Sequence, residues 1–211
     1  VTISGTTATV NTLEDGTLNP MPGFLFSASK ELDIQKDDTL KVVVPMMQRI
    51  RTLALTLKLN PGDERRIAST ASTLTGIALS MDLATGSVTA TEGKSVAPVF
   101  TMRSDGGETR MGTPSVETRA TGNPALATSL RLLGVMPGEK QELTLVVTLT
   151  NGTVQTIVTD LTESLKNFGG KMEPLALDAT LTLPDEEETS AEVSANISDW
   201  KIVDNGDIDV N

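Results

Sequence analysis

The residues of this chain that can do chemistry are carboxylates, hydroxyls, lysines and arginines, because the sequence contains no histidine and no cysteine. Without histidine there is no Ser-His-Asp triad, no Cys-His pair and no HExxH zinc helix. Without cysteine there is no disulfide, zinc knuckle, iron–sulfur cluster or thiol nucleophile. What remains is carboxylate, Ser/Thr, Lys and Arg chemistry, or binding without catalysis.

Two short motifs resemble known signatures but lack the residues that those signatures need. Gly93-Lys94-Ser95 resembles the end of a phosphate-binding loop, yet Val88 stands where that loop requires its first glycine. Ser27-Ala28-Ser29-Lys30 matches S-x-x-K, whose chemistry needs the lysine one helical turn from the serine, with K-T-G and S-D-N elements elsewhere. This segment is typical of extended chain and both further elements are missing. We therefore predict no function for either motif.

The acidic residues suggest a cation site and a hydrolase site. The cluster Asp204-Asn205-Gly206-Asp207-Ile208-Asp209 is rich in oxygen but lacks EF-hand spacing and the closing glutamate. We expect a solvated acidic tail there, and cation binding by residues 204–209 stays open. Paired carboxylates for glycoside hydrolysis depend on spatial proximity, but aromatic sugar platforms are scarce because aromatics make up only 2% of the chain. We predict no enzyme activity, no cofactor, and no catalytic, cofactor-binding or metal-ligating residues.

Two arginine pairs stand out. Arg49 and Arg51 precede the alternating leucines that begin at Leu53 and share their face, and Arg65-Arg66 forms a second short pair. One interpretation places Arg49 and Arg51 at a sheet edge or end, where their charged groups reach water. The other is a contact with an acidic partner subunit.

Charge limits the partners. With 17 basic and 28 acidic residues the net charge is -11, which repels phosphate backbones and anionic membranes. We expect no nucleic-acid partner. No run of eighteen apolar residues is present, so the sequence predicts no membrane-spanning helix. The chain begins at Val1 without a signal-peptide pattern, which is typical of a mature, trimmed or engineered segment.

The elements that carry these residues are predicted to be strands. Threonine, which favours pleated surfaces, supplies 31 of 211 residues. Apolar side chains alternate with polar or small ones in three segments, 53–59, 143–149 and 175–183. Period-two alternation predicts strands with one face on a core and the other toward water.

A hairpin and one helix follow from local signals. Asn151-Gly152 predicts a two-residue type I′ turn, with Leu149 opposite Val154 and Leu145 opposite Val158. Asp160-Leu161-Thr162-Glu163 predicts a helix start, and the helix should end near Phe168 before Gly169. A second helical turn is expected within 63–72.

Many short strands separated by Gly, Pro and Asn turns indicate an all-β sandwich architecture. The small, polar stretch Ala90–Lys94 is interpreted as a connector. We therefore expect an N-terminal β-sandwich over 1–93 and a C-terminal one over 94–211, with the short helix in the second and a long polar loop at Ser104–Asn123.

Several segments resemble, in order, the fimbrial anchor and minor-subunit (FimB-type, fimbrillin-like) family of Bacteroidales. They are Phe24–Ser29, Pro45–Leu55, Leu74–Gly86, the Asn151-Gly152 hairpin, the helix start at Asp160-Leu161-Thr162, Leu175–Leu183 and Ile197-Ser198-Asp199-Trp200. The resemblance implies two tandem transthyretin-like (Ig-like) sandwiches in an exported lipoprotein of the outer membrane. The lipidated cysteine is absent, and the first sandwich is expected to lack its early strands, which would leave a groove or an edge exposed.

The resemblance also implies a function. The chain is expected to be a structural subunit of a cell-surface fimbria, an anchor or accessory subunit, joined to other fimbrial subunits by β-strand addition. The alternative is an adhesin domain that binds a carbohydrate or a host protein through the Ser104–Asn123 loop. With either function, we expect membrane contact only through a lipid anchor that is missing from this chain.

Overall fold

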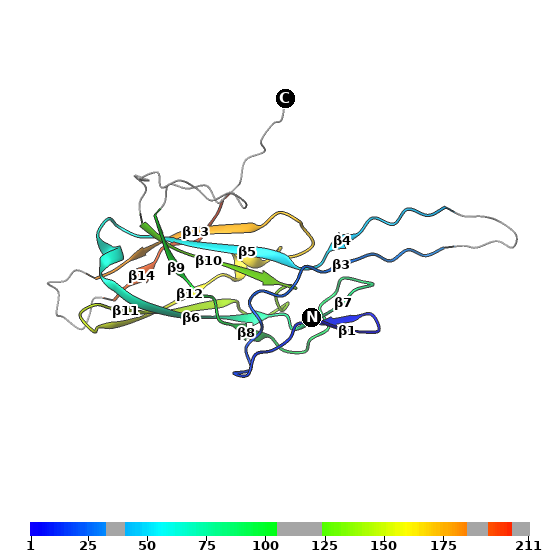
Figure 1. The fold of residues 1–211 in the computed structure, drawn as a ribbon, viewed down its shortest axis with the longest axis horizontal. Coiled ribbons are helices and arrows are strands. Elements are labelled where there is room, and N and C mark those ends of the chain that lie inside the picture. The colour runs from blue at the N-terminus through cyan, green and yellow to red at the C-terminus, as the bar shows by residue number, and fades with distance from the viewer. Residues whose placement is uncertain (33–40, 105–123, 185–193, 204–211) are drawn as a thin grey trace, which may run out of the picture.

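The computed structural model describes residues 1–32, 41–104, 124–184 and 194–203. These residues form an all-β structure with one α-helix and one 3₁₀ turn (Figure 1). The small elements are β1 (Thr2–Ser4), β2 (Thr7–Thr9), β3 (Phe26–Ser27), β4 (Met47–Gln48), η1 (Asp63–Arg65), β7 (Ser80–Asp82), β8 (Lys94–Val96), β9 (Thr101–Ser104), α1 (Thr162–Leu165), β14 (Asn196–Ile197) and β15 (Lys201–Ile202). The long strands are β5 (Arg51–Lys58), β6 (Ile67–Ile77), β10 (Pro124–Leu132), β11 (Glu142–Leu149), β12 (Val154–Asp160) and β13 (Leu175–Thr182).

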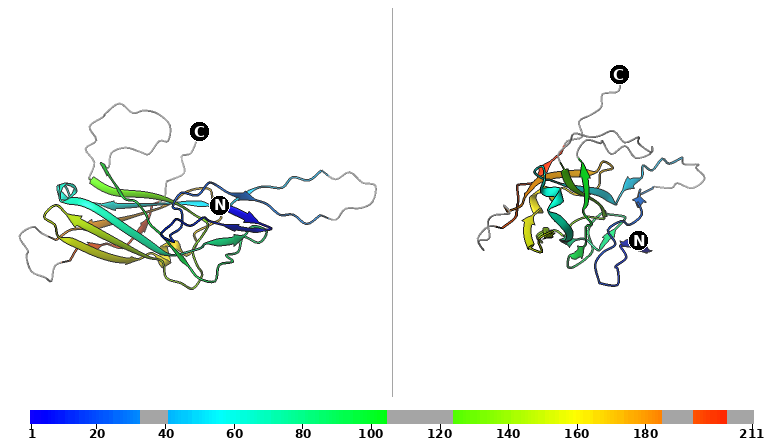
Figure 2. Two further views of the ribbon diagram at one scale, coloured as in Figure 1. Left: turned by 60° about the horizontal axis from the view of Figure 1, so that its bottom comes forward. Right: turned by 60° about the vertical axis from the view of Figure 1, so that its left-hand side comes forward.

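Two sheets form the body of the described structure. One runs in the order β14-β13-β5-β10-β9, with β15 also on β13, and the other in the order β12-β11-β6-β8. They lie as two layers, as Figures 1 and 2 show. β1, β2 and β7 form a small sheet of their own, and β3 pairs only with β4.

The alternating segments form the walls of the core, as predicted. Within β5, Leu53, Leu55 and Leu57 are fully buried, and the residues between them are partly exposed. β11 and β13 show the same alternation. β13 lies parallel to β5, with Leu177 paired with Leu55. The apolar faces of these strands therefore form a continuous core between the two sheets.

The strand pairing does not follow the boundary that we expected at residue 93. β5, from the first half of the chain, lies between β13 and β10 from the second half. β6 likewise lies between β11, from the second half, and β8, which begins just after that position. A boundary at residue 93 would cut through both sheets. The small, polar composition around residue 93 suggested a connector. Local composition contains no information about long-range strand pairing, so it could not show that the two sheets extend across this position.

The hairpin at Asn151-Gly152 exists, but its predicted register was wrong by one residue. Thr148 pairs with Val154 and Leu145 pairs with Ile157. The loop has three residues, 150–152, closed by Leu149 N–H donating to Thr153 O at 2.8 Å, and Gly152 has a φ of 87°. A three-residue loop with a left-handed third residue is the next most common hairpin connection. Because one residue of shift exchanges the faces of a strand, Ile157 is buried and Val158 is exposed.

The helical turn expected within 63–72 is confirmed, whereas the helix expected from Asp160 to near Phe168 was predicted too long. α1 is a single turn that begins after Leu161 rather than at Asp160. Asp160 Oδ1 still accepts a hydrogen bond from Thr162 N–H at 2.8 Å. Within 63–72 only η1 is helical, and β6 begins at Ile67. Such short turns are held by burial, here of Leu161 and Leu165, since isolated helices of this length do not form in water.

Two extended segments close the open sides of the sandwich. On one side Leu18, which is buried, donates its N–H to Ser95 O at 2.8 Å, and Pro20 O accepts from Arg131 N–H at 2.8 Å. On the other side the C-terminal segment 195–203 follows β13, and Trp200 Nε1 donates to Thr159 Oγ1 on β12 at 3.1 Å. Covered edges of this kind prevent uncontrolled strand pairing.

Candidate interaction surfaces

A two-branched extension leaves one end of the sandwich. We call it the apolar arm and define it as the described residues 26–32 and 41–48. Its two branches run outward beside each other from the body (Figures 1 and 2). They pair as strands only at the base, where Phe26 faces Gln48 and Ser27 faces Met47. Beyond that point the described backbone of the arm has no strand partner.

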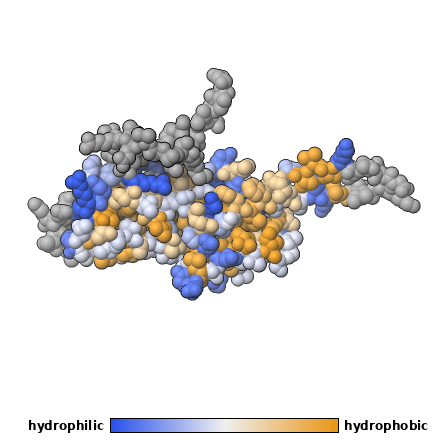
Figure 3. Space-filling view, viewed as in Figure 1, coloured by the Kyte–Doolittle hydropathy of each residue, from blue (hydrophilic) through white to orange (hydrophobic). Residues whose placement is uncertain are grey.

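The arm carries large apolar side chains in water. The exposed ones are Phe26, Leu32, Val43, Val44, Met46 and Met47. Val43 is 86% exposed and Met46 is 61% exposed, and Figure 3 shows the hydrophobic surface continuing from the body onto the arm. An exposed, contiguous apolar patch is typical of an interaction site. A two-stranded ribbon is also only marginally stable alone in water, so a partner would stabilise this one.

Arg49 fastens the base of the arm to the body. Its Nε donates to Ser27 Oγ at 2.7 Å, and its Nη2 donates to Leu83 O at 3.1 Å. Ser27 Oγ in turn donates to the same carbonyl at 3.0 Å. Arg49 is 9% exposed, so the interpretation that its head reaches water was wrong. A buried guanidinium needs acceptors, and these carbonyl and hydroxyl groups supply them.

Arg51 is also buried, with 7% of its surface exposed. Its Nε donates to the carbonyl oxygen of Glu173 at 2.8 Å, and its guanidinium carbon lies 5.6 Å from the centre of the Phe168 ring. Burial lowers the pKa of Arg51, an effect that the nearby charge of Glu173 opposes. The prediction that Arg51 shares the face of the leucines is confirmed, and the interpretation that its charged group reaches water was wrong.

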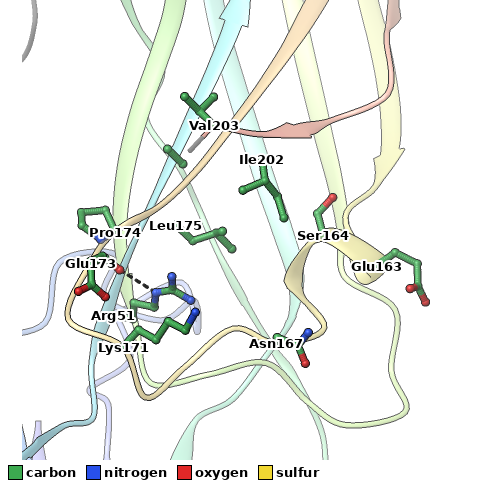
Figure 4. Close-up of a pocket in the computed structure, with 11 residues that line it drawn as sticks. Arg51, Glu163, Ser164, Asn167, Lys171, Glu173, Pro174, Leu175, Ile202 and Val203 are labelled. Atoms are coloured by element: carbon green, nitrogen blue, oxygen red, sulfur yellow. Dashed lines mark hydrogen bonds between the residues drawn. The ribbon is translucent and has the colours of Figure 1, made fainter. Parts of the chain in front are cut away.

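A pocket of about 600 Å³ opens beside Arg51, between α1 and the start of β13 (Figure 4). Its apolar wall contains Leu175, Ile202 and Val203, and its polar rim includes Asn167 and Lys171. Glu163 and Glu173 also line it. No local pattern predicted this pocket, because its lining comes from three separate segments of the chain.

The other predicted features lie apart from both surfaces. Arg66 Nη1 forms an ion pair with Asp63 at 2.7 Å, and its Nη2 donates to Pro184 O. Arg65 is solvent-exposed. In the Gly93-Lys94-Ser95 motif, the N–H of Gly93 donates to the Glu139 carboxylate at 2.9 Å. The backbone group that would bind a phosphate therefore already has an acidic partner.

Some predictions concern residues outside the described ranges. The acidic tail Asp204–Asp209 is one of them, and so is the loop Ser104–Asn123 except for its first residue. Over residues 1–32, 41–104, 124–184 and 194–203, no three acidic side chains come close enough to hold a metal ion. In those same ranges no helix is long and apolar enough to cross a bilayer.

The comparison with protein families decides the family of this chain. Residues 1–206 match the family of fimbrillin-A associated anchor proteins Mfa1 and Mfa2. The chain belongs to the Mfa2 family. Its members are anchor proteins rather than enzymes, in agreement with the expectation that this chain has no enzyme activity. The resemblance to Bacteroidales fimbrial anchors is thereby confirmed. Among curated proteins none matches the chain significantly.

Solved structures of adhesin-like proteins are similar to this Mfa2-family chain. A candidate adhesin from Bacteroides ovatus shares 14% identity and a TM-score of 0.45, with 82% of this chain and 59% of that one covered. A second candidate adhesin from the same species shares 9% identity and a TM-score of 0.46, covering 90% of this chain and 61% of that one.

A candidate cell adhesion protein from Bacteroides fragilis shares 12% identity and a TM-score of 0.39, covering 95% of this chain and 63% of that one. The chain thus spans about three fifths of the length of these solved chains. Because the TM-scores lie below 0.5, no property of this chain follows from the likeness.

Proposed function

We propose that this Mfa2-family protein is an anchor or accessory subunit of a cell-surface fimbria and that it joins other fimbrial subunits by β-strand addition. The observation that carries the proposal is the apolar arm. Its six exposed apolar side chains stand on backbone that is paired at only two positions. In β-strand addition, unpaired backbone groups of this kind supply the hydrogen bonds, and alternating side chains supply the specificity.

The family resemblance supports two further parts of the proposal. We place the protein at the outer membrane surface, as part of an exported lipoprotein. Since this sequence contains no cysteine, the lipidated cysteine would lie outside it. We also propose a transthyretin-like type for the sandwich. A tandem arrangement would then require strands beyond the two sheets described here.

The test compares two variants of the full-length tagged protein in the bacterium that encodes it. The arm variant carries Val43→Thr and Met46→Gln, which makes the most exposed part of the arm polar. The matched control carries Val154→Thr and Val158→Thr on β12, where the two valines are 56% and 59% exposed. Surface extracts are purified on the tag, and the bound proteins are identified by mass before and after denaturant washes.

We expect the unmodified protein and the β12 control to retain fimbrial subunits through the washes and the arm variant to lose them. If both variants retain the subunits, the arm is not the assembly surface. If no fimbrial subunit binds even to the unmodified protein, the proposed function is wrong. Retention of a host protein or glycan instead would favour the alternative hypothesis of an adhesin.

A further inference from the structure

The pocket beside Arg51 contains a buried cation with unused hydrogen-bonding capacity. Of the five N–H groups of the Arg51 guanidinium, one donates to Glu173 O, and no other acceptor is present among the described residues. No fully buried side-chain nitrogen in those residues lacks a partner. The Nη atoms must therefore belong to the small exposed fraction of Arg51, which faces the pocket in Figure 4.

The charged residues around the pocket are two basic and two acidic side chains, which differ in where they lie. Lys171 borders the same pocket and forms no ion pair with a described residue. Glu163, the first of the two acidic lining residues, lies 3.5 Å from Lys166 outside the pocket. The carboxylate of Glu173, the second, forms no ion pair with Arg51, but its charge still opposes the lowering of the Arg51 pKa. The lining thus contains two cations and two carboxylates, and the Glu163 carboxylate points away from Arg51 (Figure 4).

The wall opposite the cations is aliphatic. Ile202 and Val203 are 63% and 37% exposed, and with Leu175 they form an apolar surface next to the guanidinium. A guanidinium presents two parallel N–H groups that match the two oxygens of a carboxylate. The aliphatic wall suits hydrocarbon side chains. Sugar ligands usually stack on aromatic rings, and the lining contains none.

We propose that this pocket binds a glutamate or aspartate side chain of a partner peptide, with Arg51 as the anchor and Leu175, Ile202 and Val203 contacting a neighbouring aliphatic residue. The proposal depends on the proposed function only for the source of the peptide, a neighbouring fimbrial subunit. It places a second, polar contact on the body of the protein, separate from the apolar arm.

The test uses the peptide Ac-Val-Glu-Val-NH₂ and its neutral counterpart Ac-Val-Gln-Val-NH₂, titrated into the ¹⁵N-labelled full chain. We expect saturable amide shifts in residues 164–173, 175–176 and 202–203 with the Glu peptide. The Gln peptide should bind roughly tenfold more weakly, because it lacks the charge-assisted pair. N-Acetylneuraminic acid serves as the sugar-acid probe and is not expected to saturate the site.

Three variants identify the residues responsible. Arg51→Gln should abolish binding of the Glu peptide. Lys171→Gln should weaken it several-fold, and it keeps the proposal testable if the buried Arg51 variant does not fold. Lys201→Gln, which removes an exposed charge on β15 outside the pocket, should have no effect.

Equal binding of the Glu and Gln peptides, shifts outside the pocket, or equal loss in Lys201→Gln would each overturn the proposal. Saturation by the sugar acid alone would make the ligand a glycan and also overturn it. None of these results bears on the co-purification of fimbrial subunits through the arm, so the two proposals can fail independently.

Discussion

The guanidinium of Arg49 lies directly against Gly86, so that a β-carbon at Gly86 would come within 2.5 Å of Arg49 Nη1. Gly86 also has a φ of 76°, a conformation that side chains disfavour. This glycine therefore provides the space in which Arg49 can bond to Ser27 and Leu83. A residue in the loop after β7 thus determines how the base of the arm is held.

Replacing Gly86 tests that relationship. Gly86→Ala should destabilise the fold by about 2–4 kcal/mol, because backbone strain is joined by displacement of a buried, hydrogen-bonded arginine. The control is Gly138→Ala, with a φ of 79° and open space around the new methyl group. It should cost only the strain, about 1 kcal/mol. Denaturant unfolding measures both values, and equal losses would contradict the role assigned to Arg49.

The hairpin register predicts opposite consequences for neighbouring residues on β12. Ile157→Ala should lower the free energy of unfolding by about 2–4 kcal/mol, because it leaves a cavity opposite Leu145. Val158→Ala should change it by less than about 0.5 kcal/mol, because that side chain is exposed. Urea unfolding curves of the two variants decide the matter. A larger loss for Val158→Ala would restore the register of a two-residue turn.

Asp82 predicts part of the acid sensitivity of the protein. Its carboxylate accepts hydrogen bonds from Thr85 N–H at 2.9 Å, from Thr6 Oγ1 at 2.8 Å and from Ala84 N–H at 2.8 Å. These bonds, led by that from the Thr85 backbone, lower the pKa of Asp82. Because the pKa of Asp82 is lower in the folded state, the ionised carboxylate stabilises the fold at pH values above its unfolded pKa of about 3.9. That stabilisation is lost as the pH falls through the folded pKa.

Asp82→Asn should therefore lower the melting temperature at pH 7 and lower it less at pH 2. Thermal unfolding followed at several pH values measures this difference. A decrease that is the same at both pH values would mean that the charge of Asp82 does not contribute. Glu92→Gln serves as the control, because Glu92 is exposed and, among the described residues, pairs only with Lys94. Its effect on the melting temperature should be small at both pH values.

Trp200 reports on the segment that closes the sandwich beside β12. It is the only tryptophan of the chain, and Thr159→Val would remove the acceptor of its Nε1–H without changing side-chain volume. We expect a loss of about 0.5–1.5 kcal/mol and a change in tryptophan emission. Thr156→Val, at an exposed position on the same strand, should leave both unchanged. An unchanged emission in Thr159→Val would show that Trp200 is held by other contacts.

The sequence by itself determined the local features of this protein. Alternation at 53–59, 143–149 and 175–183 predicted strands with a buried face, since period two places every second side chain on the same face. The absence of His and Cys removed most catalytic chemistry, and ordered motifs indicated the family. Each of these inferences depends only on residues near one another in the chain or on composition.

Only the tertiary structure decided which strands pair and what the arginines contact. β5 pairs with β13 across more than a hundred residues, so the expected boundary at residue 93 could not be judged from local composition. Arg49 and Arg51 are buried because carbonyl groups from distant loops, at Leu83 and Glu173, supply their acceptors. The pocket beside Arg51 is formed in the same way, since its walls meet only when separate segments of the chain fold together.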